Sequence, residues 1–100
     1  MPDYVEKCMA SYVESLVEAV ELYNPQPRSY RRLGTKALLD LSIQPGHWVP
    51  KEDVISRIGA KGTGLQPWID AGIVEKKGEM RRIRPEFYSA MKEAIQQHGW

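Results

Sequence analysis

The sequence has little cysteine, little net charge and no long apolar run. A single cysteine, Cys8, excludes an internal disulfide framework and a zinc site built on several thiolates. No apolar segment approaches the roughly 20 residues that a transmembrane helix needs, so we expect no membrane contact. Asp3 and Glu6 stand where a secretory signal peptide would be basic and then apolar, so we expect a cytoplasmic protein.

What is present indicates a folded domain. The chain has 100 residues, of which 42% are hydrophobic, and this is enough to build one core. Eight glycines and seven prolines are an ordinary content, which excludes collagen-like and low-complexity classes.

Charge is distributed unevenly along the chain. Residues 1–24 hold five acidic residues and one basic residue, whereas residues 25–100 hold thirteen basic and eight acidic residues. Two clusters contain most of the bases: Arg28, Arg31, Arg32 and Lys36, and then Lys76, Lys77, Arg81, Arg82 and Arg84. Such clusters are typical of a phosphate-binding surface, and the alternative for either one alone is an ordinary solvated surface.

The N-terminal segment, residues 1–24, predicts one long amphipathic helix over residues 4–23. Its apolar side chains cover one half of the helical wheel, and Asn24-Pro25 ends the pattern. A coiled-coil-like seam within this face predicts dimer contacts, and its residues are Val5, Met9, Tyr12, Leu16 and Tyr23. The alternative is that the face covers its own domain. Cys8 lies on the same face and is expected to be buried, the alternative being a redox-active thiol at a dimer interface.

The second segment, residues 25–100, predicts helices and one small hairpin. A helix capped by Ser29 or Thr35 runs to about Leu41, with Tyr30 on its inward face. A short strand follows at 47–49, then a helix with Pro50 in its first turn that spans 51–58, and a short helix at 65–71. Strands at 73–77 and 80–84 flank a Gly78-Glu79 turn, and a last helix extends to about residue 97. The predicted fold class is mainly α with a small β-hairpin.

This order of elements resembles the winged helix-turn-helix superfamily over residues 30–96. The segments that carry the resemblance are TKALLDL at 35–41, WVPKEDV at 48–54, LQPWIDAGIVEK at 65–76 and IRPE at 83–86. The resemblance implies a winged helix domain at 25–100, with an added long N-terminal helix and a C-terminal helix.

The resemblance also implies binding of double-stranded DNA by a small dimeric transcriptional regulator. In that superfamily the third helix enters the major groove and the hairpin, or wing, contacts the backbone or the minor groove. By position, the third helix would contact DNA through Lys61, Thr63 and Gln66. The wing would contact it through Lys76, Lys77, Arg81 and Arg82. Flanking contacts to phosphates would come from Arg28, Arg31, Arg32 and Lys36.

One departure from the superfamily pattern changes the expected binding mode. Gly62, Gly64 and Pro67 disfavour a long third helix, and its outer face is polar but not basic. The wing carries more positive charge than this helix, and its basic residues are expected to be exposed. We therefore expect contacts that are directed mainly at phosphates and depend strongly on salt.

The sequence leaves three alternatives to a DNA-binding winged helix. A winged helix that serves as a protein-interaction module, docked through the N-terminal helix, is the main alternative. The segment 58–65 weakly resembles a helix-hairpin-helix, but its glycine spacing differs from that motif. For an enzyme the spacing offers no catalytic constellation, and His47 and His98 do not form a metal pair, so we expect neither catalysis nor a metal nor a cofactor. His98 lies near an apolar stripe and is expected to be a packed histidine with satisfied hydrogen bonds.

Overall fold

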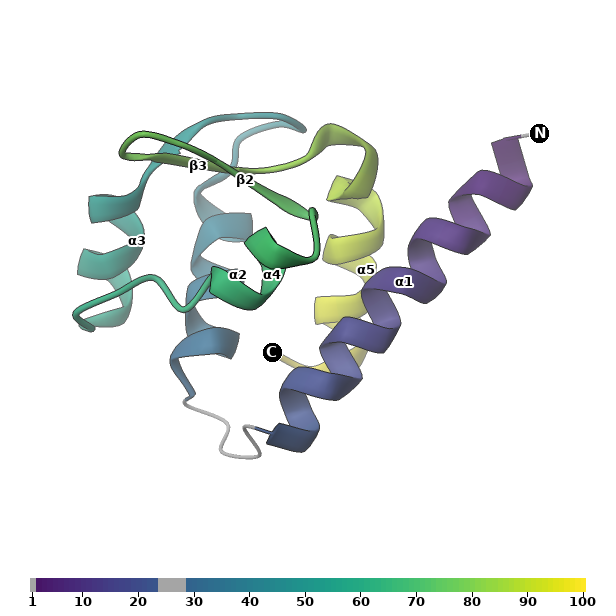
Figure 1. Ribbon diagram of the computed structural model, residues 1–100, viewed down its shortest axis with the longest axis horizontal. Helices are drawn as coiled ribbons and strands as arrows, with labels where there is room; N and C mark the ends of the chain where they lie inside the picture. Colours follow the sequence, from purple (N-terminus) through teal and green to yellow (C-terminus); the bar gives the residue numbers. More distant parts are fainter. Residues whose placement is uncertain (1, 24–28) are drawn as a thin grey trace.

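The computed structural model describes residues 2–23 and 29–100, and the side chains of residues 8–23 and 29–100. The chain is mainly helical with a small three-stranded antiparallel sheet (Figure 1). The elements in chain order are α1 (Pro2–Tyr23), α2 (Tyr30–Leu41), β1 (Val49–Pro50), α3 (Lys51–Ile58), α4 (Gln66–Asp70), β2 (Val74–Lys77), β3 (Met80–Ile83), the short 3-10 helix η1 (Pro85–Phe87) and α5 (Tyr88–His98). The prediction of a mainly α chain with a small hairpin is confirmed.

Local sequence signals set most of the helix ends. The Ser29 hydroxyl accepts a hydrogen bond from the backbone N–H of Arg32 at 3.4 Å, so Ser29 rather than Thr35 is the N-cap of α2. Gly59 adopts a left-handed φ of 68° and ends α3, as predicted. Pro50 is the last residue of β1 and precedes α3, so its placement inside the first helical turn was wrong.

The sheet has the strand order β1-β3-β2, with β2 at one edge. Val74 of β2 lies opposite Ile83 of β3, and Lys76 lies opposite Arg81. Side chains alternate between the two faces of a strand, so Arg81 shares the face of Ile83. Val74 and Ile83 are both buried, which makes this face the inner one.

Helix α1 packs along α5 and η1, and its apolar face joins the core of its own chain (Figure 1). Val13, Val17 and Val20 are buried there. The main core side chains from other elements are Leu38, Val54, Leu65, Trp68, Ile73, Ile83, Met91 and Ile95. The alternative in which α1 covers its own domain therefore accounts for the central part of its apolar face.

The predicted dimer seam lies at the margin of that face. The Tyr12 hydroxyl donates a hydrogen bond to the carbonyl of Ala71 at 2.6 Å, and Leu16 packs against the core. Met9 is half-buried and Tyr23 is exposed, while the side chain of Val5 lies outside the described residues. Cys8 is exposed, so the expectation of a buried thiol was wrong.

His98 holds α1 against α5 through two carboxylates. One ring nitrogen contacts Glu14 and the other contacts Glu21, both on α1. The hydrogen bond with Glu14 raises the pKa of His98, and the charge of Glu21 raises it further against an opposing effect of burial. The expectation of a packed His98 with satisfied hydrogen bonds is therefore confirmed, although periodicity along α5 does not reveal that its partners are the acids on α1.

Helix α2 and the segment before α4 touch backbone to backbone. A Cβ atom on Gly34 would lie 1.7 Å from the carbonyl oxygen of Thr63, and one on Gly64 would lie 2.4 Å from the carbonyl oxygen of Tyr30. Gly64 also adopts a φ of 71°, which other residues rarely take. Both glycines are therefore required for this approach.

Replacing Gly34 by Ala should lower the free energy of unfolding by about 3 kcal/mol, since a backbone carbonyl must move to admit the methyl group. Gly62→Ala is the matched control, because a Cβ at Gly62 meets nothing within 4 Å. Urea denaturation of the three proteins measures the difference. Equal stability of the two variants would contradict the close contact.

The His98 contacts should make stability depend on pH. The raised pKa means that the folded state binds the proton more tightly, so this contribution is complete below the ordinary histidine pKa of 6.5 and is lost as pH rises through the raised value. We expect His98→Gln to abolish the part of the stability that is lost as pH rises from below 6.5 through the raised pKa of His98. Urea denaturation across that range tests this, and an unchanged pH profile in the variant would refute it.

Candidate nucleic-acid interface

Helix α4 is short and presents a neutral outer surface. It has five residues, and Trp68 anchors it in the core. The Gln66 amide donates to the Asp70 carboxylate at 2.7 Å, and both side chains are exposed. Thr63 accepts a hydrogen bond from the backbone N–H of Leu65 at 3.3 Å. Two of the three residues predicted as third-helix contacts are therefore engaged locally, and only Lys61 extends freely into solvent.

Arg81 is the clearest correction among the predicted wing residues. Its side chain was expected to be exposed, but the residue is only 7% exposed. Its Nη1 donates to the carbonyls of Gly78 and Met80, both at 2.8 Å. Arg81 therefore ties the hairpin turn from the inner face of the sheet.

The Arg82 guanidinium is also held by neighbouring side chains of the protein. Its Nε and Nη2 both donate to Oε1 of Glu75, at 3.0 and 2.7 Å, and these two residues face each other across the hairpin. The guanidinium lies 4.6 Å from the centre of the Trp48 ring, within the range of a cation–π contact. Arg84 pairs with Glu86 at 3.0 Å. The charge of these two arginines is thus largely balanced inside the protein.

The basic cluster predicted at the start of α2 contains both side chains with partners inside the protein and a free side chain. The Lys36 ammonium donates to the main-chain oxygen of Trp100 at 2.6 Å, and the Arg32 guanidinium lies 5.7 Å from the centre of the Trp100 ring. Arg31 is exposed and makes no side-chain contact of this kind. Arg28 lies outside the described residues.

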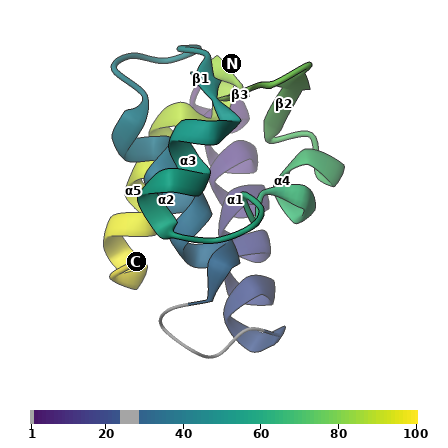
Figure 2. The same ribbon diagram turned by 90° about the vertical axis from the view of Figure 1, so that its left-hand side faces the viewer.

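Four of the predicted cations remain exposed and form neither an ion pair nor a side-chain hydrogen bond within residues 8–23 and 29–100: Arg31, Lys61, Lys76 and Lys77. Lys76 and Lys77 belong to edge strand β2, whereas Arg31 and Lys61 belong to the start of α2 and the segment that links α3 to α4. In both views α3 runs from the sheet to that linking segment, and α4 follows the segment (Figures 1 and 2). The hairpin turn meets the start of α3, where the backbone N–H of Lys51 donates to the Glu79 carbonyl at 2.8 Å. The exposed cations therefore lie on segments that precede and follow a neutral α4 in the chain.

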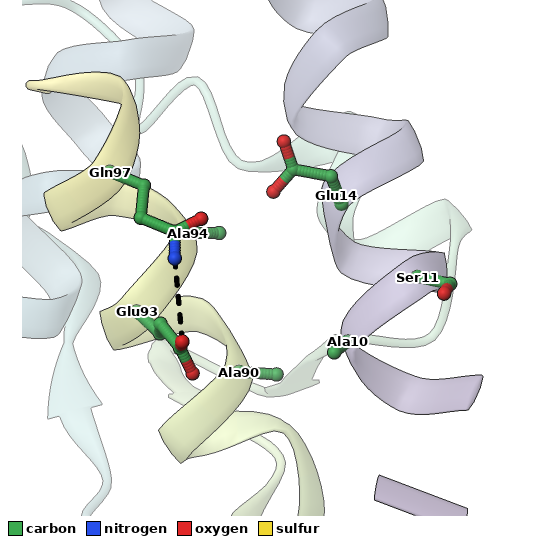
Figure 3. Close-up of a pocket in the computed structure, with 7 residues that line it drawn as sticks. All are labelled: Ala10, Ser11, Glu14, Ala90, Glu93, Ala94 and Gln97. Atoms are coloured by element: carbon green, nitrogen blue, oxygen red, sulfur yellow. Dashed lines mark hydrogen bonds between the residues drawn. The ribbon is translucent and has the colours of Figure 1, made fainter. Parts of the chain in front are cut away.

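A hollow of about 260 Å³ between α1 and α5 has a different character. Figure 3 shows Glu14 extending into it from α1, while Glu93 and Gln97 line the α5 side and are joined by a hydrogen bond of 3.4 Å. The other lining residues are small: Ala10, Ser11, Ala90 and Ala94. Its two carboxylates would repel a phosphate, so this hollow does not suit nucleic acid.

Among residues 2–23 and 29–100 no group of three or more His, Cys, Asp or Glu side chains is arranged to hold a metal ion. None of the helices in this part is long and apolar enough to cross a membrane.

Comparisons with known proteins add no relative. No protein-family model matches the chain, and neither the curated proteins nor the solved structures contain a match.

Sequence reasoning missed one exposed side chain near these cations. Tyr30 was placed on the inward face of its helix, but it is 59% exposed. It is the first residue of α2, where the helix extends past the core. Ser29, one of the two expected N-caps, is the sequence signal for this end position, because a cap at Ser29 makes Tyr30 the first residue of the helix.

Arg81 and Lys76 lie opposite each other across the hairpin, and we expect their replacement to have different effects on the free energy of unfolding. Arg81→Ala removes two hydrogen bonds to the turn and should lower the free energy of unfolding by about 1–2 kcal/mol. Lys76→Ala, at an exposed position, should change it by less than about 0.5 kcal/mol. Urea denaturation compares them, and an equal effect of both changes would mean that Arg81 does not hold the turn.

Proposed function

We propose that the chain is a winged helix-turn-helix protein that binds double-stranded DNA mainly through phosphate contacts. The order α2-β1-α3-α4-β2-β3 supports the fold proposal, as does the strand order β1-β3-β2. In this arrangement the β2–β3 hairpin is the wing and α4 is the third helix.

One observation carries the DNA-binding proposal, namely the four exposed cations on the segments before and after α4. Arg31 and Lys61 form one pair and Lys76 and Lys77 form the other, and none of the four is neutralised by a described acidic side chain. Cations that are not committed to internal ion pairs can replace the counterions of a DNA backbone, and the release of these ions favours binding. Two pairs on separate segments suit contacts with more than one phosphate of the backbone.

The surface of α4 predicts weak direct reading of bases. Gln66 and Asp70 are the exposed polar residues of this helix, and they bond to each other. A bidentate contact from Gln66 to adenine would require this pair to separate. The proposed binding is therefore sequence-tolerant and strongly dependent on salt, since phosphate contacts position a protein without reading sequence.

The proposed DNA-binding protein is a homodimeric regulator whose two copies meet at the C-terminal end of α1. Leu22 and Tyr23 at the C-terminal end of this helix are 74% and 77% exposed. Tyr12 is 47% exposed but its hydroxyl is bonded to Ala71, and Leu16 packs against the core, so Leu22 and Tyr23 are the most accessible apolar surface of α1 for a second copy. The same exposed pair favours the second candidate function, a protein-interaction module docked through α1.

The double change Lys76→Glu and Lys77→Glu should weaken binding to a random-sequence duplex by roughly tenfold or more. The slope of log K against log salt should become shallower by about 2, because two phosphate contacts are lost. Fluorescence anisotropy from low to physiological salt measures both quantities.

Lys92→Glu is the control for the change in charge. Lys92 is exposed on α5, which lies on the opposite side of the molecule from α4 (Figure 2). The Lys92→Glu variant should keep nearly the wild-type slope of log K against log salt. Absence of binding by the wild-type protein at low salt would reject DNA binding and leave the protein-interaction module.

A further inference from the structure

A hollow at the start of α2 is lined by the aromatic ring of Tyr30 and by two of the exposed cations, Arg31 and Lys61. Its volume is about 520 Å³, and it lies between Tyr30 and Arg31 on one side and the α3–α4 linking segment with Lys61 on the other. Clefts that hold small ligands have volumes of roughly 300–1,000 Å³, so the space suits a ligand larger than a single phosphate.

The walls of this hollow are fixed by the contact between Gly64 and the Tyr30 backbone. The two backbones touch at Gly64, where any Cβ would be 2.4 Å from the Tyr30 carbonyl oxygen. Gly59 and Gly62 complete the opposite wall without side chains, so a ligand can approach the main chain closely. The distance between Tyr30 and the linking segment is therefore set by the fold.

The chemistry of the hollow matches one nucleotide. Arg31 and Lys61 supply two cations for a phosphodiester, and Tyr30, with 59% of its surface exposed, supplies a ring face for a base. A paired base inside a duplex is already stacked on its neighbours and cannot use this ring. Away from the ends of a duplex, only an unpaired nucleotide can contact both the cations and the ring.

We propose that this hollow binds an unpaired nucleotide of the DNA, so that the protein prefers a duplex with a single-stranded overhang to a blunt duplex. The proposal rests on the DNA-binding function proposed above and specifies the form of DNA that is bound. It assigns Tyr30 as the residue that determines this preference, and the wing as the site that holds the adjoining duplex.

Anisotropy with two labelled probes tests the proposal: a blunt random duplex, and the same duplex with a three-nucleotide overhang. The wild-type protein should bind the overhang probe about tenfold more tightly, as one stacked base provides. Tyr30→Ala should remove this advantage and leave blunt-duplex binding nearly unchanged. Tyr30→Phe keeps the ring and should keep the advantage. The Lys76→Glu, Lys77→Glu variant should weaken binding of both probes and preserve their ratio.

The possible failures are distinguishable. Equal affinity of the wild-type protein for the two probes, or an overhang advantage that survives in Tyr30→Ala, would overturn the nucleotide site while blunt-duplex binding still supported the DNA-binding function. Absence of binding to both probes would overturn both proposals. A 2-aminopurine in the overhang gives a second measurement on the wild-type protein, which does not depend on folding of the variants. Its fluorescence should fall on stacking against Tyr30, and an unchanged signal at saturation would overturn the site.

Discussion

The arrangement of this protein depends on a contact between two stretches of backbone. Helix α2 and the segment before α4 approach so closely that Gly34 faces the Thr63 carbonyl and Gly64 faces the Tyr30 carbonyl. No other residue type fits at these positions without movement of the main chain. The contact determines where α4 begins, and hence how Trp68 enters the core. It also holds the segment that carries Lys61 against the start of α2, which carries Arg31, so the placement of these two cations follows from it.

Arginine and lysine are used differently around the hairpin. Arg81 and Arg82 use their planar guanidinium groups to bind two acceptors at once or to stack on a ring, and both become part of the scaffold. Lys76 and Lys77 lie on the neighbouring strand and extend into water. A count of basic residues therefore overestimates the charge available to a ligand. The arginines give the hairpin its rigidity, and the lysines give it its positive surface.

Local patterns in the sequence were enough to predict the elements but not all side-chain environments. Hydrophobic periodicity and the turn residues predicted α3, the hairpin and its Gly78-Glu79 turn to within a residue or two. The burial of Arg81 was also accessible, because strict alternation places it on the same face as Ile83. The pairing of His98 with Glu14, and the approach of Gly34 to Thr63, join segments far apart in the chain. No local pattern encodes such contacts, which is why these parts of the fold and of the candidate site were missed.

The position of β2 at the edge of the sheet has a consequence for solubility. An edge strand exposes a row of backbone N–H and C=O groups that can pair with the edge of another molecule, and such pairing begins aggregation. β2 has four residues, of which Lys76 and Lys77 are two, and the other edge, β1, has two residues and contains Pro50. Lysine charge and proline both oppose the addition of a foreign strand. The two lysines therefore protect the monomeric sheet from self-association, whatever ligand they also contact.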